Sequence, residues 1–197
     1  NLYKFVLQQS QDFATEALND HQKTLRMRGR PKIVLARNYE EAMELYNKFQ
    51  DNMLGVITDV RYPRNGKKDS LAGIKLCSEI RKKDPFVPLI IQSSETENQV
   101  YANRYAASFV DKNSKKMDVD LQRIVSDNFG FGDFIFRNPT TNAEVAKVRN
   151  LKDLQNIIYS VPSESLLYHI SRNHISRWLY SRAMFPVAEF LRQITFD

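Results

Sequence analysis

Apolar runs alternate with amphipathic stretches between residues 32 and 130. Each run is apolar on both faces, which is typical of parallel strands covered by helices on either side. Four runs predict strands: KIVLA (32–36), LGVITDV (54–60), VPLIIQSS (87–94) and ASFVDK (107–112). Apolar residues at three- and four-residue steps predict helices over residues 39–50, 70–83, 95–106 and 118–130. The connection RYPRNGKKD (61–69) is expected to be a loop, so the order predicts an α/β fold.

The first 28 residues predict one long helix that Gly29 and Pro31 end. Its apolar positions are Leu2, Phe5, Val6, Phe13, Ala17, Leu18 and Leu25. A doubly wound sheet with a first helix here needs its central strand one before Asn1. Since the chain also lacks an initial Met, we expect a piece of a longer protein. The alternative makes YKFVL (3–7) strand one, ending at Gln8 and Gln9.

The alternation of predicted strands and helices ends at Gly130. Residues 131–148 predict two strands around a Pro/Thr/Asn turn, which is a β-hairpin. Residues 151–161 and 163–194 predict helices, the second interrupted near Phe185 and Pro186. We therefore expect two parts: an α/β domain over residues 1–128, and a hairpin with helices over residues 129–197 that serves as a linker or docking region.

Three strand ends carry polar side chains of complementary chemistry. Asp59 ends one predicted strand, Ser93 and Ser94 end the next, and Lys112 ends the last. The carboxyl ends of parallel strands meet at one edge of the sheet, where ligands bind in open α/β folds. An acid, a hydroxyl and a lysine together predict an aspartate that accepts a phosphoryl group.

These residues also carry a family resemblance. Asp59 is followed by Pro63 in a D-x-x-x-P pattern, and the run AGIKLCSEIRKKDPFVPLIIQSSE precedes a strand that ends at Lys112. Residues 32–128 resemble a response-regulator receiver domain, which has a flavodoxin-like (CheY-like) fold. The resemblance implies that Asp59 is the phosphoacceptor, Ser93 the hydroxyl that contacts the phosphoryl group, Lys112 its cationic partner and Phe109 the switch aromatic. Ser94 can take the place of Ser93, because a one-residue slip turns the other side chain inward.

The chain departs from the receiver pattern in three places. The loop after Asp59 is longer before Gly73, and Asn113 stands where receivers carry a Pro. The acidic pair that holds Mg²⁺ together with the phosphoacceptor is absent, so the resemblance places it before Asn1. Under the alternative in which residues 3–7 form strand one, Gln8 and Gln9 replace that pair and the domain is an inactive pseudo-receiver.

A wider resemblance covers nearly the whole chain. FGFGDFIFR (129–137) and SVPSESLLYHISRNHISRWLYSRAMF (160–185) resemble the regulatory region of multidomain proteins of the phosphoenolpyruvate synthase and pyruvate phosphate dikinase family. The glycine-rich phosphate loop and the swivelling histidine of that family are absent from this sequence. The resemblance therefore implies a regulatory region that is not itself an enzyme, in a parent of the pyruvate, water dikinase type.

The distribution of charged and apolar residues limits the kinds of partner and location that the sequence predicts. Residues 1–128 carry 21 Lys/Arg and 17 Asp/Glu, and residues 129–197 carry 8 and 6, so the net charge of +6 is spread evenly. This spread argues against a nucleic-acid surface. No apolar run reaches the length of a membrane span, and no signal peptide precedes the first helix, so we expect a cytoplasmic location. His169 and His174 are five residues apart, which suits helix packing better than zinc ligation.

We therefore expect a receiver-like module that controls its parent enzyme, with phosphorylation on Asp59 as the switch. The expected partners are other domains of the parent, a histidine kinase and a second copy in a homodimer. A structural pseudo-receiver that dimerises the parent without phosphotransfer is the alternative. A transcription-factor receiver is disfavoured, because residues 129–197 show no helix-turn-helix and carry only +2.

Overall fold

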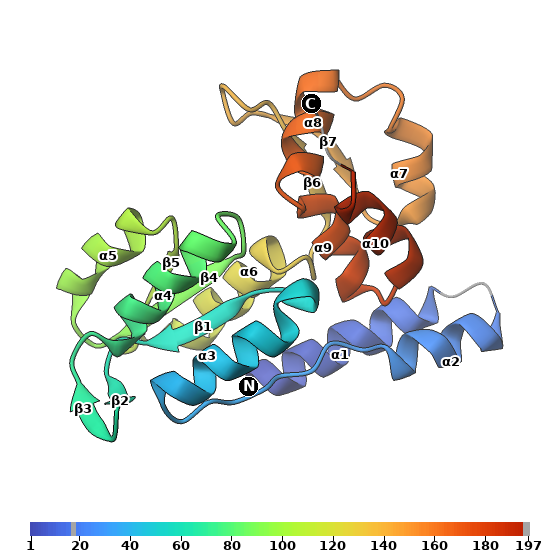
Figure 1. Cartoon of the computed structure of the whole chain (residues 1–197). Helices are drawn as coiled ribbons and strands as arrows, with labels where there is room; N and C mark the ends of the chain where they lie inside the picture. The colour runs from blue at the N-terminus through green and yellow to red at the C-terminus, as the bar shows by residue number, and fades with distance from the viewer. Residues whose placement is uncertain (17–18, 195–197) are drawn as a thin grey trace. The chain divides into compact units, whose positions relative to one another are not determined.

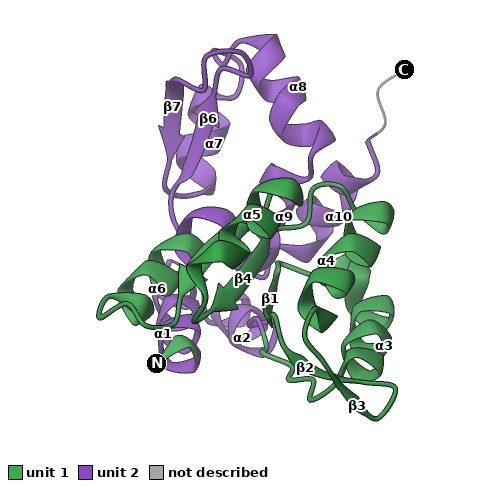
Figure 2. Cartoon of the chain, turned by 90° about the vertical axis from the view of Figure 1, so that its left-hand side faces the viewer, with its two compact units in different colours: residues 1–2, 32–124 green, residues 3–31, 125–197 purple. Residues whose placement is uncertain are grey.

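The computed structural model describes residues 1–16 and 19–194 (Figure 1). Its elements fall into two compact units, which Figure 2 colours separately. Unit 1 comprises Asn1–Leu2 and Lys32–Ile124, and unit 2 comprises Tyr3–Pro31 and Val125–Asp197. Apart from its two terminal residues, unit 1 is one continuous stretch, whereas unit 2 is assembled from both ends of the chain.

Unit 1 contains a parallel sheet with the order β1-β4-β5. The strands are β1 (Val56–Asp59), β4 (Leu89–Ser93) and β5 (Ser108–Asp111), in register from Val56 with Leu89 and from Ile90 with Ser108. The unit's helices are α3 (Tyr39–Phe49), α4 (Ala72–Lys83), α5 (Gln99–Arg104) and the first part of α6 (Met117–Asn128), with short 3-10 turns η1 (Gln50–Asn52) and η2 (Thr96–Asn98). The predicted α/β class with a parallel sheet is confirmed.

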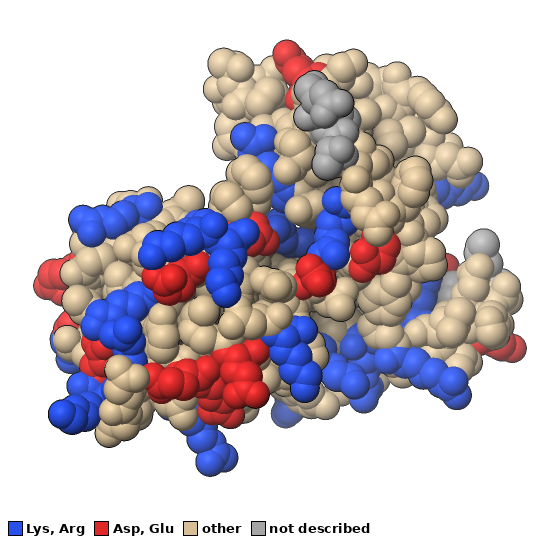
Figure 3. Space-filling model, in the orientation of Figure 1, with Lys and Arg blue, Asp and Glu red and all other residues tan. Residues whose placement is uncertain are grey.

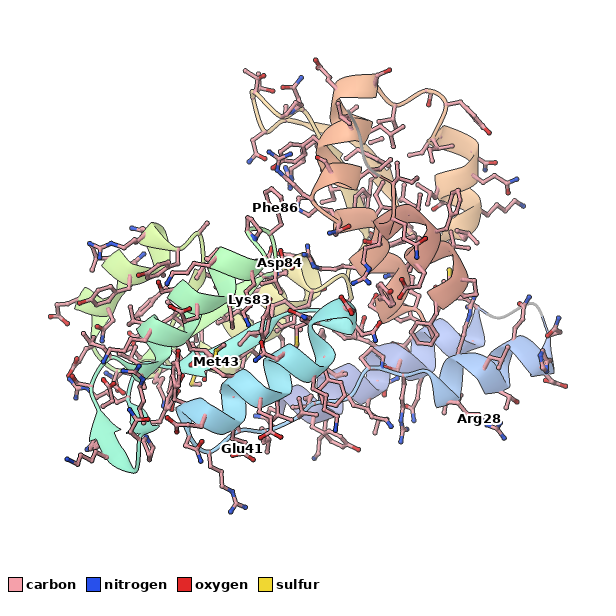
Figure 4. All side chains as sticks on the ribbon, viewed as in Figure 1. Arg28, Glu41, Met43, Lys83, Asp84 and Phe86 are labelled. Carbon is pink, nitrogen blue, oxygen red and sulfur yellow. The ribbon has the colours of Figure 1, made fainter. Side chains whose placement is uncertain are left out.

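One core joins α3 and α4 to the sheet. Its buried members include Tyr46 of α3, Ile80 and Cys77 of α4, and Ile91 of β4. Met43 also packs on this core, whereas Glu41 of the same helix points away from it (Figure 4). Figures 1 and 2 both show α6 on the opposite face of the sheet. The strands are therefore covered on both faces, which explains why their sequences are apolar throughout.

The expected loop over residues 61–69 is wrong, because this stretch contains a hairpin. Strand β2 (Tyr62–Arg64) pairs antiparallel with β3 (Lys67–Asp69). Asn65 and Gly66 form the turn with φ of 52° and 70°. Positive φ at both positions is the geometry that an Asn-Gly pair favours in a two-residue hairpin.

The expected strand over residues 32–36 is also wrong. The segment belongs to unit 1, but it pairs with no strand among the described residues. Ile33, Val34 and Leu35 are 39%, 48% and 80% exposed. A strand exists only when a neighbour completes its hydrogen-bond ladder, and the apolar pattern alone does not supply one.

Unit 2 contains a hairpin and a set of helices. The hairpin pairs β6 (Phe134–Arg137) with β7 (Glu144–Val148), as predicted. The helices are α1 (Leu2–Thr15, from Tyr3 on), α2 (Asp20–Arg28), the end of α6, α7 (Leu151–Ile157), α8 (Ser163–Ser171), α9 (His174–Ser181) and α10 (Phe185–Arg192). The predicted interruption near Pro186 is confirmed by the start of α10, and a second break occurs at Asn173, whose φ is 58°.

The single long helix expected over residues 1–28 is wrong, because α1 and α2 are separate. Asn19 caps α2 by accepting a hydrogen bond from the Gln22 backbone N–H. Ala17 and Leu18, which contributed to the predicted helix, lie outside the described residues. The alternative strand over residues 3–7 is also wrong, since these residues belong to α1.

The buried Arg182 organises the core of unit 2. Its guanidinium donates to the backbone oxygens of Gly130 and Gly132, and lies 4.1 Å from the ring centroid of Phe13 and 4.0 Å from that of Trp178. Burial lowers the pKa of Arg182 to about 9, so the side chain still carries its charge at neutral pH. These contacts tie α1 to the C-terminal helices, so residues 3–31 cluster with unit 2, whereas the sequence predicted one α/β domain over residues 1–128.

Candidate functional site

An open pocket of about 140 Å³ lies at the carboxyl ends of the parallel strands of unit 1. It brings together residues that end three different strands, as the parallel topology requires. Its lining residues are Asp59, Val60, Arg61, Gln92, Ser93, Ser94, Glu95 and Lys112. The acid, the hydroxyls and the lysine predicted from the sequence therefore share one pocket.

Asp59 and Lys112 form the central ion pair of the pocket. Lys112 Nζ lies 3.0 Å from Asp59 Oδ1 and 2.9 Å from Oδ2, so one ammonium group donates to both carboxylate oxygens. The lysine side chain is 37% exposed and the aspartate side chain 46%. The pair is thus open to solvent, and a small anionic reactant can approach the carboxylate without any opening of the fold.

Gly73 holds the backbone of Asp59 close to α4. The Gly73 N–H donates to the carbonyl of Val60 at 3.0 Å. A Cβ atom at Gly73 would lie only 1.8 Å from the carbonyl oxygen of Asp59. Glycine is therefore required here by the close approach of two backbone segments.

Ser93 has a structural task besides its place in the pocket. Its Oγ accepts hydrogen bonds from the Glu95 N–H at 3.0 Å and from Asn98 Nδ2 at 2.9 Å. The hydroxyl of the buried Ser93 thus shapes the turn that leads into η2, and its own proton is not used by either bond. Ser94 is exposed, and its carbonyl accepts from Asn113 Nδ2 at 2.8 Å. Asn113 therefore links the loop after β5 to the end of β4.

A second ion pair, which the sequence did not reveal, lines the same pocket. Arg61 Nη2 lies 2.5 Å from Glu95 Oε1, and both side chains are about half exposed, at 52% and 48%. The two residues are 34 positions apart, and no local pattern marks either of them. Their position two residues beyond Asp59 and Ser93 was the only available signal. The pocket therefore contains two carboxylates and two cations, with no net charge.

Phe109 of β5 is half-buried and packs against the core that α3 and α4 form. It pairs in register with Ile91 and does not line the pocket.

Two hydroxyl groups lie next to the backbone of Asp59. The Thr58 hydroxyl lies 2.9 Å from the Asp59 carbonyl oxygen and 3.2 Å from the Tyr62 hydroxyl. Burial raises the pKa of Tyr62 to about 12, so this phenol stays protonated beside the candidate site.

The donors present do not fit a divalent cation by themselves. No group of three or more His, Cys, Asp or Glu side chains with metal-binding geometry occurs in residues 1–16 and 19–194. The two pocket carboxylates each face a cation, Asp59 facing Lys112 and Glu95 facing Arg61. Mg²⁺ prefers six oxygen ligands, and a pair of neutralised carboxylates supplies few of them.

The two histidines of α8 and α9 form a pair in unit 2. His169 Nδ1 and His174 Nδ1 are 3.0 Å apart, and His169 Nε2 accepts from the backbone N–H of Arg137 at 2.9 Å. His169 must therefore carry its proton on Nδ1 and donate it to His174. Burial lowers the pKa of His169 to about 4 and that of His174 to about 3. The predicted packing role agrees with this arrangement.

The charges on unit 1 do not form a field of one sign on the face shown in Figure 3, where Lys and Arg side chains alternate with Asp and Glu. No helix in the described part of the chain is long and apolar enough to cross a membrane.

The chain matches no protein-family model, no curated protein and no solved structure. Its candidate function therefore rests on the geometry of the pocket.

Proposed function

We propose that this chain is a receiver-like regulatory module in which Asp59 accepts a phosphoryl group. The observation that carries the proposal is the double contact of Lys112 Nζ with both Asp59 oxygens, in one pocket with Ser93 and Ser94. The β1-β4-β5 order is compatible with part of a flavodoxin-like sheet, and a CheY-like fold belongs to this proposal.

The proposed reaction is a phosphoryl transfer. One Asp59 carboxylate oxygen forms a bond to phosphorus, and the bond between phosphorus and the donor atom breaks. With a phosphohistidine of a histidine kinase, the P–N bond breaks and the imidazole nitrogen leaves with the bonding electrons. When acetyl phosphate is the donor, acetate leaves with the bonding electrons. Lys112 supplies positive charge to the phosphoryl oxygens, and the Ser93 or Ser94 hydroxyl donates a hydrogen bond to them. Arg61 is a second cation within the pocket.

The proposed consequence is a change in the contacts of unit 1. An aspartyl phosphate draws the Ser93 hydroxyl toward it, and this hydroxyl shapes the 95–98 turn. Phe109 on the neighbouring strand is the candidate for the side chain that responds. We propose that a histidine kinase donates the phosphoryl group, and that the parent is a phosphoenolpyruvate synthase-like enzyme whose other domains receive the signal.

A second candidate is a structural pseudo-receiver that acts as an interaction module without phosphotransfer. The observation that favours it is the neutral pocket, in which both carboxylates already face cations and no third carboxylate completes a metal site among the described residues. In this candidate the Asp59–Lys112 pair simply joins the ends of β1 and β5, and a homodimer is the functional form.

Intact-mass spectrometry after incubation with acetyl phosphate, with and without Mg²⁺, separates the two candidates. The proposal predicts one phosphoryl adduct, absent from Asp59→Asn, and formed about 100-fold more slowly in Lys112→Ala. Asp120→Asn removes a partly exposed carboxylate of α6 that lies 3.6 Å from Arg123 Nη2 and serves as the control, which should behave like the unsubstituted chain. An adduct that persists in Asp59→Asn contradicts the proposal. No adduct, together with a dimer by analytical ultracentrifugation, supports the pseudo-receiver.

A further inference from the structure

The central strand of the unit 1 sheet carries a polar amide directly after a run of buried apolar side chains. β4 lies between β1 and β5, and its residues Leu89, Ile90 and Ile91 are at most 2% exposed. The next residue is Gln92, which is partly exposed and lines the candidate pocket. An apolar side chain would suit a strand that is covered on both faces, so the amide at this position requires an explanation.

Gln92 and Asp59 are neighbours across the sheet. The parallel register places Gln92 level with Asp59 of β1 and with Val110 of β5. Because successive side chains alternate between faces, residues that are level on neighbouring strands share one face. Neighbouring strands are about 4.8 Å apart, so the side chains of Gln92 and Asp59 are within reach of the same small group.

The Gln92 amide makes no hydrogen bond to any other side chain or backbone group in the described part of the chain. The two ion pairs use the charged side chains of the pocket, and the Ser93 hydroxyl accepts two hydrogen bonds. Ser94 also lines the pocket with a hydroxyl that has no partner among the described residues, but it is exposed. Gln92 is therefore the partly buried polar side chain that is free to contact a reactant.

Glutamine has the hydrogen-bonding groups that position a water molecule beside a phosphoryl group. Its carbonyl oxygen accepts from water, and its NH₂ group can donate to a phosphoryl oxygen at the same time. Enzymes that hydrolyse GTP use a glutamine in this way to orient the attacking water. The glutamine side chain is one methylene longer than that of aspartate, so from a level position the Gln92 amide can reach past the Asp59 carboxylate.

Glu95 is the other acceptor of the pocket that could orient a water molecule. Both of its carboxylate oxygens are already engaged, Oε1 with Arg61 Nη2 at 2.5 Å and Oε2 with Asn98 Nδ2 at 3.3 Å. Water can enter the pocket, because the side chains of Asp59 and Lys112 are 46% and 37% exposed. The Gln92 carbonyl is thus the unoccupied acceptor level with the candidate phosphoacceptor.

We propose that Gln92 orients the water molecule that hydrolyses the aspartyl phosphate of Asp59, so that the module ends its own signal. The water oxygen forms a bond to phosphorus, and the bond between phosphorus and the Asp59 oxygen breaks. The electron pair of the broken bond returns to the carboxylate, and a water proton passes to the departing phosphate. This inference rests on the proposed phosphorylation of Asp59 and names the residue that limits the lifetime of the phosphorylated state.

The decay of the phosphorylated chain tests the proposal. The full chain is phosphorylated with acetyl phosphate and Mg²⁺, the donor is removed by gel filtration, and the remaining adduct is followed by intact-mass spectrometry. Gln92→Leu replaces the amide with an apolar side chain of similar size beside the buried Ile90 and Val110. We expect its adduct to form within about twofold of the normal rate and to decay about tenfold more slowly, because hydrolysis loses one hydrogen bond in the transition state.

Gln99→Leu is the matched control, because it makes the same chemical change at an exposed position of α5 outside the pocket. Its adduct should form and decay like that of the unsubstituted chain. Decay in water enriched in the heavy oxygen isotope then identifies the atom that is attacked. Water that Gln92 orients toward phosphorus should leave the label in inorganic phosphate and none in the Asp59 carboxylate.

Three outcomes overturn the proposal. The first is a Gln92→Leu adduct that decays as fast as that of the unsubstituted chain. The second is equal slowing of formation and decay, since Gln92 then only maintains the shape of the pocket. The third is label in the Asp59 carboxylate, because the water then attacks the carbonyl carbon. The absence of any adduct on the unsubstituted chain would overturn the proposed phosphorylation of Asp59 as well, so the failure of each proposal has its own signature.

Discussion

Single residues determine how closely the backbone segments around the pocket approach each other. Gly73 is the clearest case, because the Asp59 carbonyl occupies the space that a side chain at position 73 would need. The residue types of the pocket were visible in the sequence, and Asp59, Ser93 and Lys112 could be selected because strand ends converge in a parallel sheet. The Arg61–Glu95 pair could not be predicted from the sequence, because it depends on side-chain positions that only the folded loops establish.

Substitution of Gly73 by Ala should destabilise unit 1 and displace the candidate phosphoacceptor. The new Cβ would lie 1.8 Å from a backbone oxygen, so the strand end or α4 must move. We expect a loss of about 3 kcal/mol in the free energy of unfolding, measured by urea denaturation with circular dichroism.

Gly66→Ala is the matched control for this substitution. A Cβ at Gly66 meets nothing within 4 Å, but φ is 70°, so only backbone strain of about 1 kcal/mol is expected. Equal losses in the two variants would contradict the close-approach argument.

At the scale of elements, helices and strands were predicted from different kinds of signal. A helix satisfies its own hydrogen bonds, so the periodicity of residues 39–50 and 70–83 was enough to predict α3 and α4. A strand depends on a distant neighbour, which explains why residues 32–36 are extended but unpaired. The Asn65-Gly66 pair, in contrast, was a local hairpin signal that the sequence contained and the loop prediction neglected.

The start of α3 offers a test of a local signal. Asn38 caps the helix, because its side-chain oxygen accepts the Glu41 backbone N–H at 2.8 Å. Asn38→Ala leaves that N–H unpaired and should cost about 1 kcal/mol in the free energy of unfolding, measured by urea denaturation. Glu44→Ala, at an exposed position within the same helix, should change stability by less than about 0.5 kcal/mol.

At the scale of the whole molecule, the two units should respond differently to acid. Unit 2 contains the neutral His169–His174 pair, in which Arg137 N–H and the shared proton occupy the positions where further protons would bind. Its Trp178 is the only tryptophan of the chain and is buried, so tryptophan fluorescence reports on unit 2 alone. Trp178 fluorescence can therefore follow the effect of acid on unit 2 without a signal from unit 1.

Unit 2 should lose stability as the pH falls below 6.5. An unfolded histidine has a pKa near 6.5, whereas the folded values are about 4 for His169 and about 3 for His174. Between pH 6.5 and the lower pKa values of the folded state, the unfolded chain binds more protons than the folded chain. The free energy of unfolding is therefore greatest above pH 6.5 and decreases toward pH 4. From pH 7 to pH 5 we expect a loss of about 2–4 kcal/mol, measured by urea denaturation with Trp178 fluorescence.

The double variant His169→Gln/His174→Gln is the control for this pH dependence. Its absolute stability is expected to be lower, because the substitutions disturb packing beside Phe134 and Phe136. Its stability should nevertheless change little between pH 7 and pH 5. A pH slope equal to that of the unsubstituted chain would show that other groups cause the acid response.

The division of the chain has a consequence for the order in which it folds during synthesis. Most of unit 1 is continuous and ends at Ile124, so its long-range contacts are available before the remaining residues leave the ribosome. Helices α1 and α2 precede unit 1 in the sequence, but most of their partners in unit 2 follow it. The apolar face of α1, which includes Phe13, must therefore stay uncovered while unit 1 is synthesised, which makes α1 the segment in greatest need of a chaperone.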